Sequence, residues 1–439
     1  MPIKRRHLFG AAAAVAATAA LLGGVLASTT DAGPAPRATP QVAVASQLDG
    51  FAAGDTAAEI DQLERRVHAN PEDAEGLTLL GLAYEQRVRE TGDPSFYPRS
   101  EEALRRAIRL VPDDDLAFTG LATLAASRHR FGEARDLARK ALSLNSYSAA
   151  ALGILGDANV ETGRYPAAFA AFERMVATKP SAGAYARISY ARELLGRTEA
   201  AITAMKLAVS AGSGTNEPAA WSLVELGNLY FNSGRLRPAE RAYREALARF
   251  PGYHRAQAAL ARVAATRGRT DEAVALYRRA LEAVPLPEYA ARLGETLAAA
   301  GRDAEATEAY ELVDVMQRLF EANGARTELE TALVDLDRGV NLADALSRAR
   351  EAYAERRSID AEDVLAWGFY RNGRCEEALD HSRRALRLGT RDALKLFHRG
   401  MIERCLGRAA AARATFREAL GINPCFSPRW APVAKEAAR

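Results

Sequence analysis

The chain has 439 residues, of which 48% are hydrophobic and 26% are charged, and its 59 basic and 56 acidic residues leave a formal net charge of +3. This hydrophobic content excludes a disordered polymer, and the length suits two or three domains or one long repeat array. Three of the basic residues, Lys4, Arg5 and Arg6, stand close to the N-terminus, so the rest of the chain is nearly neutral. Because nucleic-acid binding relies on a basic surface, we expect no nucleic-acid partner.

Residues 1–27 have the pattern of a secretory signal. A basic start is followed by an uncharged, Ala-rich stretch that ends Val25-Leu26-Ala27, with small side chains where a signal peptidase cleaves. We predict export by this segment, through the general or the twin-arginine route, with a cleaved signal peptide and a retained membrane anchor as the two outcomes. Residues 28–55 are rich in Ala, Pro and Thr and predict a flexible linker. No later apolar run approaches membrane length, so we expect membrane contact only through the N-terminal segment.

The body of the chain repeats with a period close to 34 residues. The clearest marker is a Gly that is followed by Arg, and its spacing, completed by Gly92, His129 and Gly339, gives about ten units. The Gly-Arg pairs begin at Gly163, Gly196, Gly234, Gly268, Gly301, Gly373 and Gly407. Ala recurs five positions after most markers, a large side chain recurs nine positions after many of them, and Gly recurs seven positions before several.

These offsets indicate paired helices. Spacings of three, four and seven residues lie on one stripe of an α-helix. Small residues let two helices approach closely, and the Tyr or Phe between them fills the gap. A Gly at the marker accepts the positive φ that ends the first helix of each unit. The sequence therefore predicts an all-α, right-handed superhelical solenoid of about ten helix-turn-helix repeats, in which each hairpin contacts only its neighbours.

The pattern resembles the tetratricopeptide repeat (TPR) family, in which small residues, Gly, Ala, Tyr and Pro occupy the same positions of a 34-residue unit. The resemblance is closest over residues 145–285 and is good over residues 363–424. It implies an N-terminal TPR array over residues 56–310, which begins with a lone second helix. Irregular bridging helices over residues 311–340 and a C-terminal TPR array with a capping tail over residues 341–439 follow.

No catalytic or metal-binding motif stands out. The sequence has no phosphate-binding loop, nucleophile elbow, HExxH or EF-hand spacing, and its six His residues are scattered. Asp113, Asp114 and Asp115 follow Pro112 and are better explained as helix capping than as a cation site. We therefore predict that the protein is not an enzyme and has no metal and no cofactor.

The three cysteines, Cys375, Cys405 and Cys425, form no CxxC pair. Cys375 begins the second helix of its unit and Cys405 ends the first helix of the next unit. These helix ends are neighbours in a stacked solenoid, so a Cys375–Cys405 disulfide with a free Cys425 is a candidate. The sequence favours the alternative, in which the thiols are reduced and lie in the core.

The resemblance also implies a binding face. In TPR proteins the first helix of each unit lines a concave surface, and residues about two, three, six and ten positions before the marker point inward. This rule selects six candidate binding residues: Asn228, Phe231, Trp367, Tyr370, Phe397 and Met401. Exposed aromatic and Met side chains suit an apolar peptide or an amphipathic helix. The competing interpretation places Trp367 and Phe397 between helices as ordinary core.

These observations favour a non-catalytic scaffold that is exported to the cell envelope and binds protein partners, as peptide segments or helices, on its concave face. One alternative is a self-associating structural subunit, because an open solenoid can stack end to end. Another is a membrane-anchored assembly factor. The sequence leaves open the identity of the partner and the oligomeric state.

Overall fold

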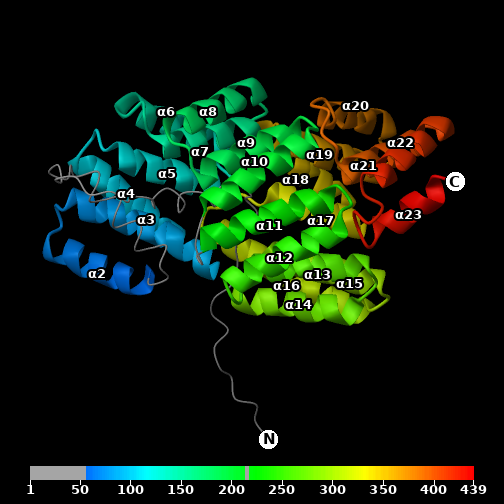
Figure 1. The fold of residues 1–439 in the computed structure, drawn as a ribbon, viewed down its shortest axis with the longest axis horizontal. Coiled ribbons are helices and arrows are strands. Elements are labelled where there is room, and N and C mark those ends of the chain that lie inside the picture. Colours follow the sequence, from blue (N-terminus) through cyan, green and yellow to red (C-terminus); the bar gives the residue numbers. More distant parts are fainter. Residues whose placement is uncertain (1–55, 213–216) are drawn as a thin grey trace, which may run out of the picture.

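A computed structural model describes residues 56–212 and 217–439, and in these ranges the chain forms 22 helices and no strand (Figure 1). The predicted signal segment, residues 1–27, and the predicted linker, residues 28–55, lie outside the described residues. None of the helices in the described ranges combines the length and the apolar character needed to cross a bilayer.

The helices form ten consecutive hairpins, with one helix before them and one after them. The helix before them is α2 (Thr56–Ala69), and the helix after them is α23 (Trp430–Ala437). The first five hairpins are α3 (Ala74–Thr91) with α4 (Phe96–Leu110), α5 (Asp115–Ser127) with α6 (Phe131–Leu144), α7 (Ala149–Glu161) with α8 (Tyr165–Thr178), α9 (Ala182–Leu194) with α10 (Thr198–Ala211), and α11 (Glu217–Asn232) with α12 (Leu236–Arg249). The other five are α13 (His254–Thr266) with α14 (Thr270–Ala283), α15 (Pro287–Ala299) with α16 (Asp303–Ala322), α17 (Glu328–Arg338) with α18 (Leu342–Glu355), α19 (Ile359–Arg371) with α20 (Cys375–Ala385), and α21 (Ala393–Cys405) with α22 (Ala409–Ile422). The predicted all-α solenoid of about ten repeats is confirmed.

The repeated residues act as their spacing predicts. Every marker Gly has φ between 69° and 82°, and His129 replaces it in the second hairpin with φ 56°. Four hairpins contain a Gly whose added Cβ would lie within 3 Å of a ring carbon of the aromatic residue on the second helix. These pairs are Gly156 with Phe172, Gly227 with Tyr243, Gly294 with Tyr310, and Gly400 with Phe416. The absence of a side chain on these glycines lets the two helices of each hairpin lie in close contact.

Capping residues define where several first helices begin. The side chain of Asp114 accepts a hydrogen bond from the backbone N–H of Ala117 at 2.9 Å, as expected for a helix cap. Asp73, Ser148, Ser181, Ser358 and Asp392 cap other first helices in the same way.

The solenoid also makes contacts between distant hairpins. The backbone N–H of Ile359 donates to the hydroxyl of Tyr165 at 2.7 Å, and the side chain of Asn423 donates to the carbonyl oxygen of Phe231 at 2.9 Å. Each of these pairs, and that of Thr390 with the carbonyl of Leu194, joins residues 192 to 196 positions apart. In Figure 1 the late helices α18 and α19 accordingly lie beside α7 to α10. The array therefore completes one superhelical turn in about six units and then packs on itself.

These lateral contacts join two different edges of the array. Gly163 and Gly196 lie in turns within hairpins, whereas Arg357 and Gly389 lie in loops between hairpins. A Cβ added to Gly196 would lie 2.2 Å from the carbonyl oxygen of Gly389, and one added to Gly163 would lie 2.4 Å from that of Arg357. The expectation that each hairpin contacts only its neighbours is therefore wrong. These contacts are made by backbone atoms, so no repeated residue type in the sequence indicates them.

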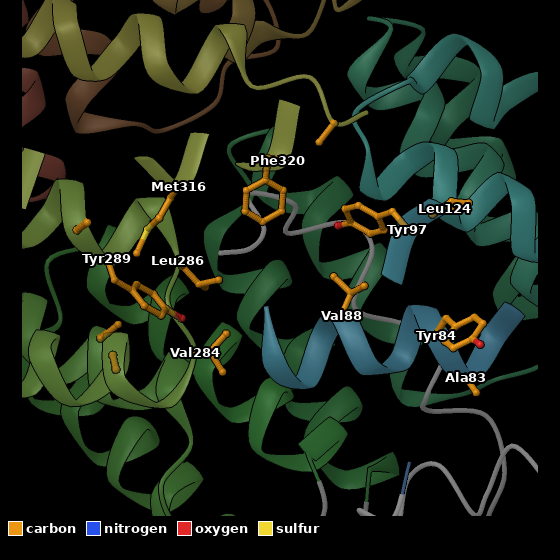
Figure 2. Close-up of a cluster of buried hydrophobic side chains, with 14 of the residues drawn as sticks. Ala83, Tyr84, Val88, Tyr97, Leu124, Val284, Leu286, Tyr289, Met316 and Phe320 are labelled. Atoms are coloured by element: carbon orange, nitrogen blue, oxygen red, sulfur yellow. The ribbon is translucent and has the colours of Figure 1, made fainter. Parts of the chain in front are cut away.

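Hydrophobic side chains strengthen the same closure. One continuous cluster of buried residues includes Val88 and Tyr97 from the first hairpin and Val284, Leu286 and Phe320 from the region of α14 to α16. In Figure 2 the hydroxyl end of Tyr97 points toward the ring of Phe320 of α16, and Val88 of α3 points into the same cluster. This cluster ends at Ala325, and a second one begins at Leu329. The core is therefore not continuous along the whole array.

Candidate functional site: the inner face of the superhelix

The first helices of four successive hairpins line the inner face of the superhelix. Positions ten before the marker are small or apolar, as in Val224, Ala258 and Ala291. Positions nine and six before the marker are mostly polar. They carry Glu225, Arg292 and Glu330 at position nine, and Asn228, Arg262 and Glu295 at position six. The inner face is therefore an apolar strip bordered by fixed charges.

A cavity of about 450 Å³ opens on this face between α11 and α17. Its apolar wall includes Tyr277, Tyr310 and Val334, and its polar wall includes arginines and carboxylates from α11, α13, α15 and α17. Arg429 and Trp430 reach the cavity from the C-terminal segment. A volume of this size accommodates one or two side chains of a peptide, or a small molecule.

A smaller cavity of about 190 Å³ lies next to it and shares Glu225, Asn228 and Arg262 with the larger one. Its other lining residues include Glu193 and Trp221. Asp157 and Arg187 also line it, but they form a buried ion pair at 2.6 Å. When Glu193 and Glu225 are both ionised, their two negative charges outnumber the positive charge of Arg262 in this cavity.

Asn228 and Arg262 form a fixed ridge between the two cavities. The side-chain oxygen of Asn228 accepts hydrogen bonds from Arg262 and from the hydroxyl of Tyr243, each at 2.9 Å. The guanidinium of Arg262 stacks 3.9 Å above the ring of Phe231. Hydrogen bonds and ring stacking hold both side chains in place, so the ridge is organised before any partner binds.

Several carboxylates of the inner face lack a close cationic partner, whereas Glu295 pairs with Arg292 at 2.8 Å and Glu330 pairs with Arg356. Burial raises the pKa of Glu193 to about 7. Burial also raises the pKa of Glu225, Glu288 and Asp337 above their ordinary values. A carboxylate that loses water without gaining a full charge partner is stabilised by an added cation. The inner face is therefore suited to a ligand that carries positive charge.

Comparison with known proteins identifies the repeat. A sequence profile described as "Tetratricopeptide repeat" matches five overlapping or successive stretches that together cover more than half of the chain: residues 95–149, 121–183, 155–216, 224–287 and 364–424. The chain belongs to the tetratricopeptide repeat family. No curated protein sequence matches it.

Several solved structures are similar to this TPR protein over part or most of its length. The "Human IFIT1 dimer with PPP-AAAA" is 16% identical, with 76% of this chain and 78% of that chain covered and a TM-score of 0.48. The structure titled "Functional Characterization of Pseudomonas Aeruginosa pilF" is 17% identical, with coverage of 48% and 90% and a TM-score of 0.35. The "Crystal structure of MamA" is 25% identical, with coverage of 37% and 92% and a TM-score of 0.29.

The six sequence-predicted residues occupy different environments in the TPR array. Asn228 lines both cavities, whereas Phe231 is buried beneath Arg262. Trp367 is only 1% exposed and Phe397 is fully buried. Met401 is also buried, and Tyr370 is half-buried and stacked on Trp367 at 4.9 Å between ring centroids. Their predicted exposure on the concave face is therefore wrong for Phe231, Trp367, Phe397 and Met401, and binding by any of the six stays a prediction.

The last two hairpins and the C-terminal segment together bury Trp367 and Phe397, as the competing core interpretation predicts. Trp367 stacks on His398 at 4.2 Å and Phe397 packs against Phe416 at 5.9 Å between ring centroids. Trp430, at the start of α23, packs edge-on against Trp367 at 5.8 Å and stacks on Phe397 at 5.4 Å between ring centroids. The indole N–H of Trp367 donates to Asp337 at 3.0 Å. The TPR offset rule does not account for a helix that follows the last repeat and covers these rings.

Sequence reasoning missed several of the lining residues. Glu225, Arg292 and Glu330 stand nine positions before the marker, and Arg255 and Glu288 stand thirteen before it. Neither offset was among those used. The signal was present in the sequence, because polar residues recur at position nine of three of these four first helices.

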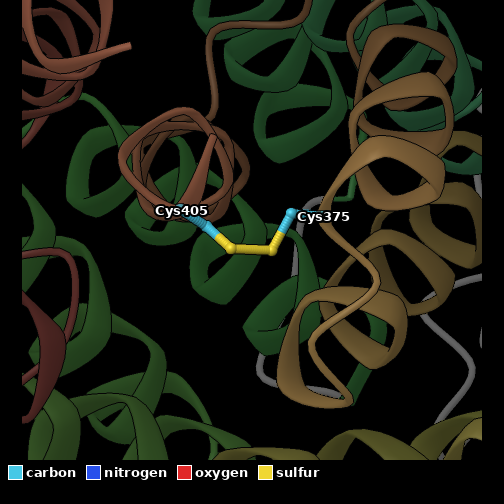
Figure 3. Close-up of a disulfide and its surroundings, with 2 residues drawn as sticks. All are labelled: Cys375 and Cys405. Atoms are coloured by element: carbon cyan, nitrogen blue, oxygen red, sulfur yellow. A yellow bond between two sulfur atoms is a disulfide. The ribbon is translucent and has the colours of Figure 1, made fainter. Parts of the chain in front are cut away.

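A disulfide joins Cys375 to Cys405, and Cys425 is free (Figure 3). The two Cα atoms lie 6.3 Å apart, because the start of α20 and the end of α21 are adjacent in the stack. The structure therefore contains the candidate bridge in place of the reduced thiols that the sequence favoured. The bond connects the ninth hairpin to the tenth, away from both cavities.

Proposed function

We propose that this TPR protein is an exported, non-catalytic scaffold that binds an extended peptide segment along the inner face of its superhelix. The observation that carries the proposal is the 450 Å³ cavity on that face, with its apolar wall and its row of fixed charges. Members of the TPR family are protein-interaction scaffolds, which supports a protein partner over a small metabolite.

We further propose that the bound segment carries a Lys or Arg next to an apolar or aromatic residue. The basic side chain would enter the 190 Å³ cavity, where Glu193 and Glu225 offer carboxylates and Trp221 offers a ring face. The apolar side chain would enter the larger cavity beside Tyr277 and Tyr310. The two cavities share the Asn228–Arg262 ridge, so adjacent residues of one segment can reach both.

Export remains a proposal that rests on the pattern of residues 1–27 and is supported by the Cys375–Cys405 disulfide. Disulfides persist in oxidising compartments outside the cytosol. Fractionation of cells that express the full chain, with mass determination of its N-terminus, tests this. Recovery of the uncleaved chain in the cytosolic fraction would contradict export.

Phage display of random twelve-residue peptides tests the binding proposal. The chain from residue 56 onward, immobilised as bait, is expected to enrich peptides that pair a basic residue with an aromatic or large apolar residue. The double variant Glu193→Gln, Glu225→Gln should lose the preference for the basic residue, because the negative cavity is neutralised. The control variant Glu173→Gln, Glu282→Gln changes two exposed carboxylates outside both cavities and should keep it.

The affinity of a selected peptide should also depend on pH. Because the pKa of Glu193 is raised to about 7, lowering the pH through 7 protonates this carboxyl and should weaken binding of a basic peptide. Fluorescence anisotropy at pH 6 and pH 8 measures this. Enrichment of acidic peptides, or equal affinity at both pH values, would contradict the assignment of the smaller cavity.

A further inference from the structure

Helix α16 differs from the other second helices of the array. It has 20 residues, whereas α12 and α14 have 14 each. One face carries Val313, Met316 and Phe320, which are buried in the core that closes the superhelical turn. The extra turns therefore belong to a helix that is anchored along its whole length on that side.

An adjacent face of α16, about 100° around the helix axis from the buried residues, is apolar and uncovered in the described part of the chain. Leu312, Val315 and Leu319 are 37%, 53% and 37% exposed. Their spacing of three and four residues places them on one stripe. A continuous apolar stripe on an otherwise charged surface is a common feature of interaction sites, whereas single exposed apolar residues are not.

The exposed Glu308 continues the line of this stripe four residues before Leu312, and two further charged residues flank it. The side chains of Glu311 and Arg318 are both exposed, and neither side chain forms a hydrogen bond or an ion pair with another described residue. They are seven positions apart, so they lie on the same flank of the helix about two turns from each other. One negative and one positive charge therefore stand beside the stripe without a partner in their own chain.

The pattern is self-complementary when the helix is reversed. Leu312 and Leu319 are equally far from the midpoint between Val315 and Met316. If two α16 helices lie antiparallel about a twofold axis at this midpoint, Leu312 of each copy faces Leu319 of the other, and the two Val315 side chains meet at the centre. Glu311 of each copy then lies beside Arg318 of the other, with an axial offset of about 3 Å at 1.5 Å per residue.

We propose that α16 is a homodimer interface, at which the stripe Leu312, Val315 and Leu319 packs against the same stripe of a second copy of this chain. An interface with twofold symmetry uses one patch twice, and the symmetric spacing of the leucines and the two unpaired charges meet that requirement. The proposal does not depend on peptide binding, because neither Glu311 nor Arg318 nor any residue of the stripe lines a cavity of the inner face.

The dimer is expected to be weak and reversible. One pair of crossing helices buries less than the roughly 1,200 Å² of a standard stable interface. Sedimentation equilibrium of the full, disulfide-bonded chain, from about 5 µM to about 500 µM, should therefore show a mass that rises from monomer to dimer. A constant monomer mass over this range overturns the proposal.

Substitutions locate the interface. Val315→Glu should keep the chain monomeric, because it places two carboxylates at the centre of the pair. Leu207→Glu is the matched control, since Leu207 is 49% exposed on α10 and lies outside the stripe. A dimer that survives Val315→Glu, or that Leu207→Glu abolishes equally, overturns the assignment to α16.

Swapping the charges of Glu311 and Arg318 distinguishes the antiparallel α16 pair from other modes of dimerisation. Glu311→Arg alone should weaken the dimer about tenfold, because each new Arg faces Arg318 of the second copy. The double variant Glu311→Arg, Arg318→Glu should recover the original affinity, since both pairs are restored with reversed sign. Thermal unfolding followed by circular dichroism verifies that each variant is folded. Failure of the double variant to recover while folded overturns the antiparallel arrangement.

Discussion

At the scale of single residues, Glu85 shows how burial in this array changes the protonation of a carboxyl group. Its side chain is buried, one carboxylate oxygen lies 3.4 Å from the hydroxyl of Ser100, and the other has no partner among the described residues. Burial raises the pKa of Glu85 to about 8. The carboxyl is therefore protonated in the folded protein at neutral pH, whereas it is ionised in the unfolded chain.

This difference gives the stability a definite pH dependence. Because the folded state binds a proton that the unfolded chain has released, the contribution of Glu85 to the free energy of unfolding is full below pH 4.5 and is lost as the pH rises toward 8. Glu85→Gln should remove this loss and raise the free energy of unfolding at pH 8.5 by about 2–4 kcal/mol relative to the wild type. Urea unfolding at pH 5 and pH 8.5 measures it. The exposed Glu72→Gln is the control, and an equal effect of both changes would refute the account.

Single residues also mark the limit of sequence reasoning about the site. The offset from the marker Gly correctly places Asn228 on the inner face, because that position repeats in every hairpin. It fails for Trp367 and Phe397 because Trp430 covers them, and Trp430 lies after the last repeat. A periodic rule describes only what each unit shares, and the covering residue occurs once.

At the scale of helices and turns, two marker glycines show two separate reasons for glycine. One is the positive φ of the turn, and the other is a close contact with the next superhelical turn. Gly196 and Gly268 have nearly equal φ, 69° and 72°, so an Ala at either position is strained in the same way. A Cβ on Gly268 would meet nothing within 4 Å, whereas one on Gly196 would lie 2.2 Å from the carbonyl oxygen of Gly389. The two positions differ only in the contact between superhelical turns.

A comparison of the two Ala variants measures that contact. Gly268→Ala should lower the free energy of unfolding by about 1 kcal/mol, which is the cost of the positive φ. Gly196→Ala should lower it by a further 1–3 kcal/mol or so, because the backbone at Gly389 must move away. Chemical denaturation of both variants tests the difference. Equal losses would show that the lateral contact contributes nothing to stability.

The disulfide between α20 and α21 is a second feature of this scale. It closes a segment of 30 residues, for which restriction of the unfolded chain predicts about 3–4 kcal/mol of stabilisation. Cys375→Ala with Cys405→Ala should therefore lower the stability of the C-terminal hairpins by about that amount. Alkylation of the wild type in urea without reductant should label Cys425 alone. Labelling of all three cysteines would show that the bridge does not form.

At the scale of the whole molecule, the ion pairs of Arg356 connect two superhelical turns. Its guanidinium contacts Glu161 of α7 at 2.6 Å and also pairs with Glu330 of α17. The residues of the first pair are 195 positions apart. All three side chains are largely buried, so removal of the guanidinium leaves two carboxylates without compensation.

Arg356→Ala should therefore loosen the closure and not only its own hairpin. Hydrogen exchange is expected to increase in α7 and α8 as well as in α18 and α19, with a loss of about 2–4 kcal/mol in global stability. Arg348→Ala is the matched control, because Arg348 pairs with Asp335 and Asp344 of its own hairpin. If protection of α7 is unchanged in Arg356→Ala, the two turns are not coupled through this residue.

The whole-molecule arrangement was the part of the fold least accessible to sequence. The hairpins could be predicted because Gly, Ala and aromatic residues repeat at fixed offsets along the chain. The closure could not, because it uses backbone carbonyls at Arg357 and Gly389 and single side chains such as Asn423. These groups belong to loops that the repeat pattern does not constrain.

The steady separation of 192 to 196 residues between laterally paired groups sets a rule for how such a chain can change in length. Duplication of one 34-residue unit between Phe231 and Ile359, the stretch that all three pairs enclose, would shift Ile359, Thr390 and Asn423 by a full hairpin and leave each donor opposite the wrong acceptor. Duplication beyond either terminus would disturb none of these pairs. The lateral pairs therefore fix the number of hairpins between their partners. A gene for such a chain can gain repeats without disturbing these pairs only outside the closed turn.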